Sequence, residues 1–310
     1  MAAHLYVFSD ASPTDWLHDG HDEDWHTIVN FVFQSDPALL PAIEKGKSHE
    51  EVLPQDPLYR HFIDSLESQL SSKTLRKWNS GISYQKQFCN SFGKSLRDSK
   101  PMISACSFQE KTLRNSKNAL LASYNRHLGG VEGRGIGFDE FIDHKGRRNL
   151  RHSFLHWRTG CHEIKGLEDQ LLVLLLMSWF IADQFKFNFC QIVKSDAFGF
   201  DQLRMSVVSD KLSGDDDSRL NSEKNLRNLI DPENDAAPFL LTRSKVSDQF
   251  SGDLLADNLA GWLTKAMITP NGPFATQAND LVSTGIWAGW HHLQLSASEL
   301  VCLPAINRLS

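Results

Sequence analysis

Two aspartates of this sequence each end an apolar, strand-like segment. Asp10 closes the run that begins at His4, and Asp210 closes the run from Met205 to Ser209. In open α/β sheets, ligands bind beyond the carboxyl ends of the strands, which is where these carboxylates are expected. Clustered carboxylates repel one another unless cations neutralise them, so the pattern predicts a site for Mg²⁺ or Mn²⁺. The alternative is that each aspartate only begins a turn or caps the segment that follows it.

The segment 252–267 is expected to be a helix that carries two further aspartates. Its apolar residues form one stripe, made of Leu255, Leu259, Trp262, Leu263 and Ala266. Asp257 lies beside that stripe in the helix interior, where aspartate costs up to ~0.7 kcal/mol relative to alanine. This cost indicates a specific role, and we predict that Asp257 binds the metal. Asp253 lies one turn earlier on the same face and is a further candidate ligand, or else a first-turn residue that favours the helix dipole.

Glu163 is predicted to supply another carboxylate. It lies in the segment 162–166, at the end of an expected strand before a long apolar helix. As an alternative, it forms an ordinary surface pair with Lys165. Two metal ions ~3.5–4 Å apart can activate a water molecule and stabilise the leaving oxygen of a phosphodiester. The predicted catalytic residues are therefore Asp10, Asp210, Asp257 and Glu163, and the predicted metal ligands are Asp10, Asp210, Asp257 and Asp253.

The charges of the chain are unevenly distributed. Between Lys73 and Lys165 there are 18 Lys and Arg against 7 Asp and Glu, although the whole chain has a net charge of -6. A basic segment of this kind can follow the phosphates of a nucleic acid, and a solvated charged face is the alternative. The residues predicted to bind nucleic acid are Lys145, Arg147, Arg148, Arg151, Arg158 and Lys165.

The order of the expected elements favours an α/β fold. Strands are predicted at residues 4–10, 26–34, 187–193, 203–210 and 239–245, with a short one at 102–108 and another ending near 163–166. Helical patterns cover much of 58–70, 167–184, 218–230 and 252–267. Strands that alternate with helices predict a mixed sheet flanked by helices, in the order that an RNase H-like core needs. We therefore expect a discontinuous core at 1–34 and 146–270, a large, mainly helical and basic insertion at 35–145, and a C-terminal extension at 271–310.

The segments that carry the carboxylates also resemble a known family. Asp10 after a first strand, the sequence EIKG at 163–166, Asp210 after a later strand and the sequence LLADNLAG at 254–261 are the matching features. Together they are similar to the uncharacterised RNase H-like family called domain of unknown function 3800, over residues 4–34 and about 150–268. The resemblance implies an RNase H-like fold and a nuclease whose substrate is unknown, and members of the family are suspected of acting against mobile elements.

The sequence departs from the family at its first motif. The family usually has Asp-Glu-Ser-Gly there, whereas this chain has Asp10-Ala11-Ser12-Pro13, without the second acidic residue and the glycine. The departure favours an alternative, in which the chain is a catalytically inactive RNase H-like module that binds nucleic acid or another protein. Either version is compatible with a subunit that acts with partner proteins in a defence system.

Other kinds of site have weaker support. The glycine-rich segment 129–137 lacks the lysine and hydroxyl residue of a phosphate-binding loop, and a hinge is the simpler interpretation. His152, His156 and His162 have spacings that zinc ligands can have, but they lack a compelling fourth partner. The five cysteines have no CxxC spacing, no secretory leader is recognised, and the apolar run 171–182 is shorter than the ~20 residues of a membrane span. We therefore expect a cytoplasmic protein with reduced cysteines and no membrane contact.

Overall fold

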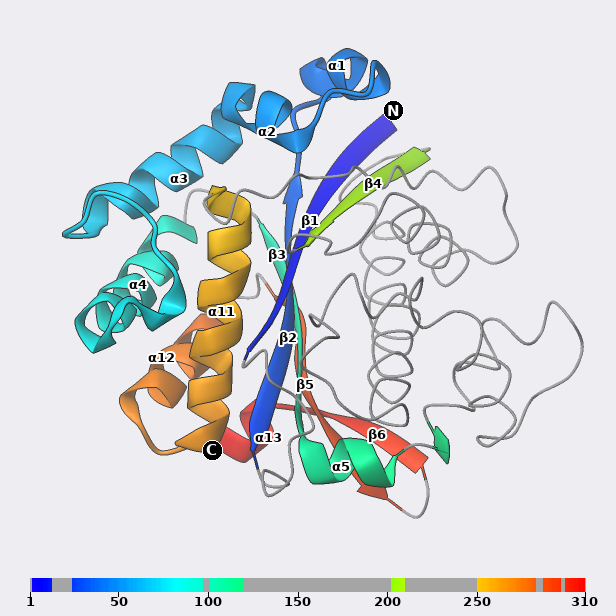
Figure 1. Cartoon of the computed structure of the whole chain (residues 1–310), viewed down its shortest axis with the longest axis vertical. Coiled ribbons are helices and arrows are strands. Elements are labelled where there is room, and N and C mark those ends of the chain that lie inside the picture. The colour runs from blue at the N-terminus through cyan, green and yellow to red at the C-terminus, as the bar shows by residue number, and fades with distance from the viewer. Residues whose placement is uncertain are drawn as a thin grey trace, which may run out of the picture.

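The computed structural model describes residues 2–12, 24–96, 101–116, 118–119, 202–209, 250–282, 287–296 and 299–309. These residues form a mixed six-stranded sheet with helices packed against it, so the α/β class expected from the sequence is confirmed (Figure 1). The strands are β1 (Ala2–Ser12), β2 (Trp25–Gln34), β3 (Met102–Gln109), β4 (Gln202–Ser209), β5 (Trp287–Ser296) and β6 (Glu299–Pro304).

The strand order in the sheet is β4-β1-β2-β3-β5-β6. β2 is antiparallel to both of its neighbours, β1 and β3, and β5 is antiparallel to β6. Two pairs are parallel, namely β1 with β4 and β3 with β5. The strands expected at 4–10, 26–34, 102–108 and 203–210 are thus confirmed, each within two residues at either end.

Strand β1, which lies between β4 and β2, is buried on both of its faces. Tyr6 and Phe8 point toward the helices, and Leu5 and Val7, which alternate with them, are also buried. A strand that is covered on both sides has an almost continuous apolar sequence, which is why the run from Leu5 to Phe8 lacks the polar alternation of a surface strand. This burial makes any charged residue of β1 exceptional.

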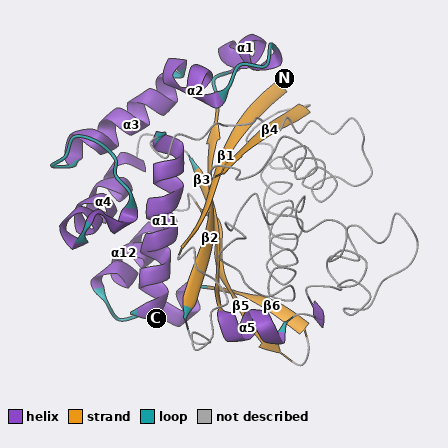
Figure 2. Ribbon diagram, in the orientation of Figure 1, coloured by secondary structure: helices purple, strands orange, loops and turns teal. Residues whose placement is uncertain are grey.

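Most of the described helices lie on one side of the sheet (Figure 2). They are α1 (Leu40–Glu44), α2 (His49–Val52), α3 (Pro57–Gln69), α4 (Ile82–Ser95), α11 (Ser251–Ile268) and α12 (Pro273–Val282), with the short α5 (Glu110–Asn115) and α13 (Ile306–Leu309) near one end of the sheet. Three single 3₁₀ turns complete the set, at Pro37–Leu39, Leu53–Gln55 and Trp78–Ser80.

Helix α3 shows how local sequence fixes these elements. Asp56 caps its first turn by accepting hydrogen bonds from the backbone N–H groups of Leu58 (2.9 Å) and Tyr59 (3.0 Å). The helix was expected from the spacing of Leu58, Phe62, Leu66 and Leu70, yet the side chain of Leu58 is 59% exposed. Since the period is 3.6 residues rather than four, the buried stripe of α3 starts from Tyr59 instead.

Helix α11 packs lengthwise on the sheet and runs in the same direction as β1. Its first turn contacts β1 so closely that a Cβ atom on Gly252 would lie 2.4 Å from the ring of Phe8. Three turns later the Thr264 hydroxyl donates a hydrogen bond to the carbonyl oxygen of Ser12 (2.9 Å). The helix therefore spans the part of β1 that contains Asp10, and the helix expected at 252–267 is confirmed.

The sheet extends beyond the core that we expected. β3 belongs to the segment 35–145 that we assigned to an insertion, and β5 and β6 belong to the segment 271–310 that we assigned to an extension. β3 hydrogen-bonds to β2 on one side and to β5 on the other, so these segments contribute strands to the same sheet as β1, β2 and β4. The elements expected at 163–166, 167–184, 187–193, 218–230 and 239–245 lie outside the described residues.

Candidate metal centre

Asp10 is a buried carboxylate near the end of β1. Its side chain is only 8% exposed, and its strand partner in β2 is Val29. Because side chains alternate along a strand, Asp10 lies on the same face as Phe8, which is the face that α11 covers. A buried carboxylate is costly unless cations or hydrogen-bond donors compensate its charge. Burial and position thus fit a metal ligand.

The parallel pairing of β1 with β4 brings two strand ends to the same edge of the sheet. Ser9 of β1 and Ser209 of β4 are partners in this register. The next residue in each strand's sequence is an aspartate, Asp10 after Ser9 and Asp210 after Ser209. Asp210 itself lies outside the described residues.

Asp257 contacts a loop that precedes α4. Its Oδ2 atom accepts a hydrogen bond from the backbone N–H of Trp78 at 2.6 Å. The side chain is half-buried, on the flank of α11 that faces residues 75–80. Through this hydrogen bond Asp257 anchors the loop to α11. No pattern in the sequence indicated this contact with Trp78.

Asp253 is buried in the first turn of α11, beside Tyr59 of α3. Burial raises the pKa of the Tyr59 hydroxyl well above its usual value, and the negative charge of Asp253 raises it further. The Tyr59 hydroxyl also forms a hydrogen bond with the Ser251 hydroxyl (2.9 Å). The first-turn position suits a carboxylate because the positive end of the helix dipole stabilises it.

The three described carboxylates do not form a complete metal site by themselves. Within the described parts of the chain, no group of three or more His, Cys, Asp or Glu side chains is arranged to hold a metal ion. The other predicted site residues lie outside the described residues, namely Glu163, Asp210, Lys145, Arg147, Arg148, Arg151, Arg158 and Lys165. Of the predicted ligands in this part of the chain, Asp10 and Asp253 are buried, and Asp257 is half-buried on the flank of α11 that faces residues 75–80.

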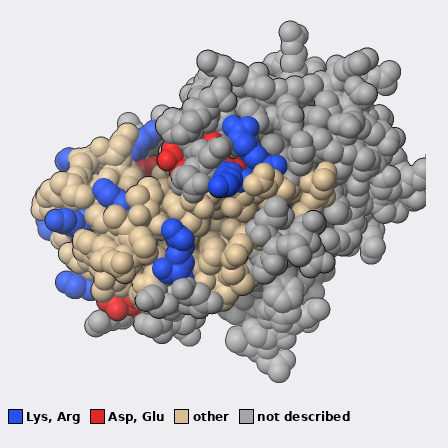
Figure 3. Space-filling view, turned by 90° about the horizontal axis from the view of Figure 1, so that it is seen from below, with Lys and Arg blue, Asp and Glu red and all other residues tan. Residues whose placement is uncertain are grey.

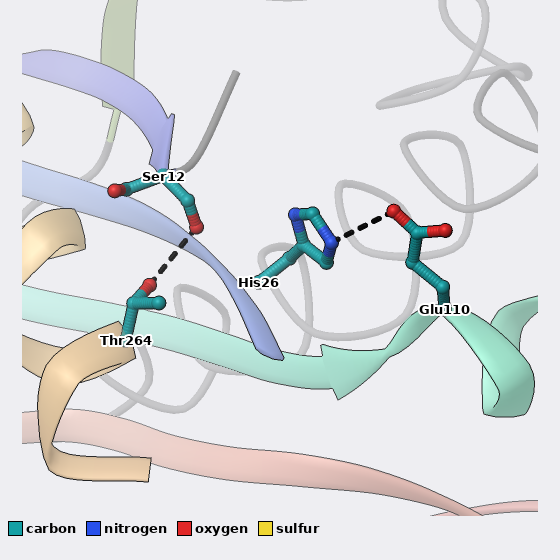
Figure 4. A network of polar contacts seen from close by, with 4 residues as sticks. All are labelled: Ser12, His26, Glu110 and Thr264. Atoms are coloured by element: carbon teal, nitrogen blue, oxygen red, sulfur yellow. Dashed lines mark hydrogen bonds and ion pairs between the residues drawn. The ribbon is translucent and has the colours of Figure 1, made fainter. Parts of the chain in front are cut away.

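The structure also contains a buried polar pair, His26 and Glu110, that was not expected from the sequence. The Nε2 atom of His26 lies 3.0 Å from Oε1 of Glu110, and both side chains are only 1% exposed (Figure 4). The His26 ring also stacks on Phe108, its partner in β3. Glu110 begins α5 directly after β3, so the register of β2 and β3 brings the two residues together. The pair joins the end of the sheet to α5. The position of His26 at the start of a strand did not indicate that a carboxylate would be its partner.

On one face of the molecule, the basic residues of the described part of the chain lie in separate groups. Seen from below in Figure 3, Lys and Arg form several patches, one of them beside acidic side chains near the undescribed part of the chain.

Comparisons with known proteins gave no relative. No family model, no curated protein and no solved structure matches the chain. Among the described residues, no helix combines the length and the apolar character that crossing a membrane requires. Two cysteines of this part of the chain, Cys89 and Cys106, are buried and are not in disulfide bonds.

Proposed function

We propose that this protein is a divalent-metal-dependent nuclease with an RNase H-like core. The single observation that supports the proposal most directly is the parallel register of β1 and β4, in which Ser9 and Ser209 are partners and an aspartate follows each of them in the sequence. The burial of Asp10 on the face covered by α11 adds to this support. Asp10, Asp210 and Asp257 would hold Mg²⁺ or Mn²⁺, with Asp253 as a further ligand and Glu163 as a further catalytic carboxylate.

The bound metal would supply an activated water and stabilise the leaving oxygen of a phosphodiester. The protein's own residues would hold the ions and the substrate backbone. Asp10, because it is buried, is suited to an ion that is removed from bulk solvent. The basic residues Lys145, Arg147, Arg148, Arg151, Arg158 and Lys165 are proposed to bind the nucleic acid, and a role against mobile elements follows only from the family resemblance.

A second candidate function is an inactive module that binds nucleic acid or a partner protein. The observation that favours it is the hydrogen bond between Asp257 and the backbone of Trp78, because it gives this aspartate a structural reason to be present. The sequence Asp10-Ala11-Ser12-Pro13, which lacks a neighbouring carboxylate, points the same way.

The test is cleavage of labelled single- and double-stranded DNA and RNA in manganese, magnesium or EDTA. Wild type is compared with Asp10→Asn, Asp257→Asn and the control Asp64→Asn, which changes an exposed aspartate of α3. We expect metal-dependent cleavage that is retained in the control and lost in the other two variants. An absence of cleavage by wild type, together with binding in EDTA, would reject the nuclease and favour the inactive module.

A further inference from the structure

A hollow of about 600 Å³ lies between the start of α11 and the loop that follows α3. Thr74, Arg76 and Lys77 line it from the loop, and Ser251 lines it from α11. The side chains of Arg76 and Lys77 are exposed, so the hollow has two cationic groups at its wall. Glu67 also lines it, but one of its carboxylate oxygens accepts the backbone N–H of Leu75 (2.9 Å).

The backbone of Arg76 is fixed on both sides by buried polar side chains. Its N–H donates to the hydroxyl oxygen of Tyr84 (2.9 Å), and the same hydroxyl donates to its carbonyl oxygen (2.8 Å). Nδ2 of Asn258 donates a second hydrogen bond to that carbonyl (2.7 Å). Asn258 is fully buried in the interior of α11, and burial raises the pKa of Tyr84 to about 12, so its hydroxyl keeps its proton near neutral pH.

Trp78 is held just as firmly two residues later. Its N–H donates to Asp257, and its carbonyl oxygen accepts a hydrogen bond from Nε2 of Gln85 (2.8 Å). Its indole ring lies directly on Gly261 of α11, where a Cβ atom would be only 2.1 Å from Cδ1 of the ring. Lys265 in turn donates a hydrogen bond to Oε1 of Gln85 (2.9 Å).

Such fixation is unusual for an exposed loop, whose backbone groups water can satisfy. Placing Asn258 and Asp257 inside a helix has a cost, because neither residue type favours helix interiors. Rigid presentation of a binding group lowers the entropy lost when a ligand binds. The feature that this rigid backbone presents to solvent is the pair Arg76 and Lys77 beside the hollow.

We propose that this hollow is a subsite for a backbone phosphate of the nucleic acid, bound by Arg76 and Lys77. The guanidinium of Arg76 offers a fork of N–H donors that matches phosphate oxygens, and Lys77 adds a point charge. Asp257, Asn258 and Gly261 are positioning residues that act through the loop. The inference rests on the proposed nucleic-acid substrate, but it requires neither metal nor cleavage.

The test measures binding of a labelled single-stranded oligonucleotide in EDTA at several salt concentrations. The double variant Arg76→Gln/Lys77→Gln is compared with wild type and with Lys86→Gln/Lys94→Gln, which removes two exposed lysines of α4. Each lost phosphate contact should lower the slope of log affinity against log salt by about 0.7 to 1. We expect a weaker slope in the first variant only. Equal slopes in the two double variants, or no binding by wild type, would overturn the proposal.

Tyr84→Phe separates positioning from stability. It keeps the ring but removes both hydrogen bonds to Arg76. If Tyr84 positions Arg76, the variant retains every charge and still loses part of the salt slope. A lower melting temperature with an unchanged slope would assign Tyr84 a purely structural role and remove the positioning argument. Because all binding is measured in EDTA, a failed cleavage assay leaves the result intact, so the subsite and the nuclease can fail separately.

Discussion

Asp257 is expected to stabilise the protein even when no metal is added. A hydrogen bond to a charged group contributes about 1.5–3 kcal/mol, whereas a neutral one contributes about 0.5–1.5 kcal/mol. Asp257→Asn keeps an acceptor for the N–H of Trp78 but loses the charge, so it should cost about 1 kcal/mol. Asp257→Ala loses the acceptor and should cost about 1.5–3 kcal/mol. At about 2 °C for each kcal/mol in a large domain, the melting temperature should fall by about 2 °C and about 3–6 °C, respectively.

Thermal unfolding in EDTA and in manganese separates this structural role from metal binding. In EDTA both variants should melt below wild type, while the exposed control Asp64→Asn should not. If Asp257 is also a ligand, manganese raises the melting temperature of wild type and of the control but not of either Asp257 variant. Melting of Asp257→Ala at the wild-type temperature in EDTA would refute the contribution of the Trp78 contact. An equal manganese shift in wild type and Asp257→Asn would refute the ligand role.

Three further predictions concern buried groups. Burial lowers the pKa of His49 to about 4, so between about pH 6.5 and pH 4 the histidine gains a proton only in the unfolded chain. The free energy of unfolding should therefore fall by up to about 3 kcal/mol as the pH is lowered across this range. Urea denaturation should show a smaller fall for His49→Leu than for wild type. Gly261→Ala should displace Trp78 and cost about 1–3 kcal/mol, measured in the same way, and a wild-type midpoint would contradict the close contact. Glu110→Ala removes the carboxylate that contacts the buried His26 ring and should cost about 1–3 kcal/mol, so a loss below about 0.5 kcal/mol would show that the contact contributes little.

Local sequence patterns were sufficient to predict those helices and strands whose apolar residues follow a clear local period or form a continuous run. β1, β2 and the short β3 were visible as apolar runs, and α11 was visible from its 3.6-residue stripe. These features depend on neighbouring residues, which determine burial and helical or extended geometry. The α/β class followed from them.

Pairings between distant segments could not be predicted in this way. β5 pairs with β3 across more than 180 residues, as Ala105 and Trp290 illustrate, so its sequence alone suggested only a C-terminal extension. Asp257 and Trp78 are 179 residues apart, and nothing near Asp257 indicated that a backbone N–H is its partner. The cost of an aspartate inside a helix indicated a specific role, but it did not tell a loop anchor from a metal ligand.

The pairing of β1 with β4 also affects how the chain acquires its structure during synthesis. His4 and Ser206, whose side chains form a hydrogen bond in the finished sheet, are 202 residues apart. At about 5–20 residues per second, the ribosome needs about 10–40 s to make that intervening chain. During this time β1 can pair with β2, but its other edge has no β4 to bind. An apolar strand with an open edge can pair with other chains, so the nascent protein is expected to need chaperone protection until β4 emerges.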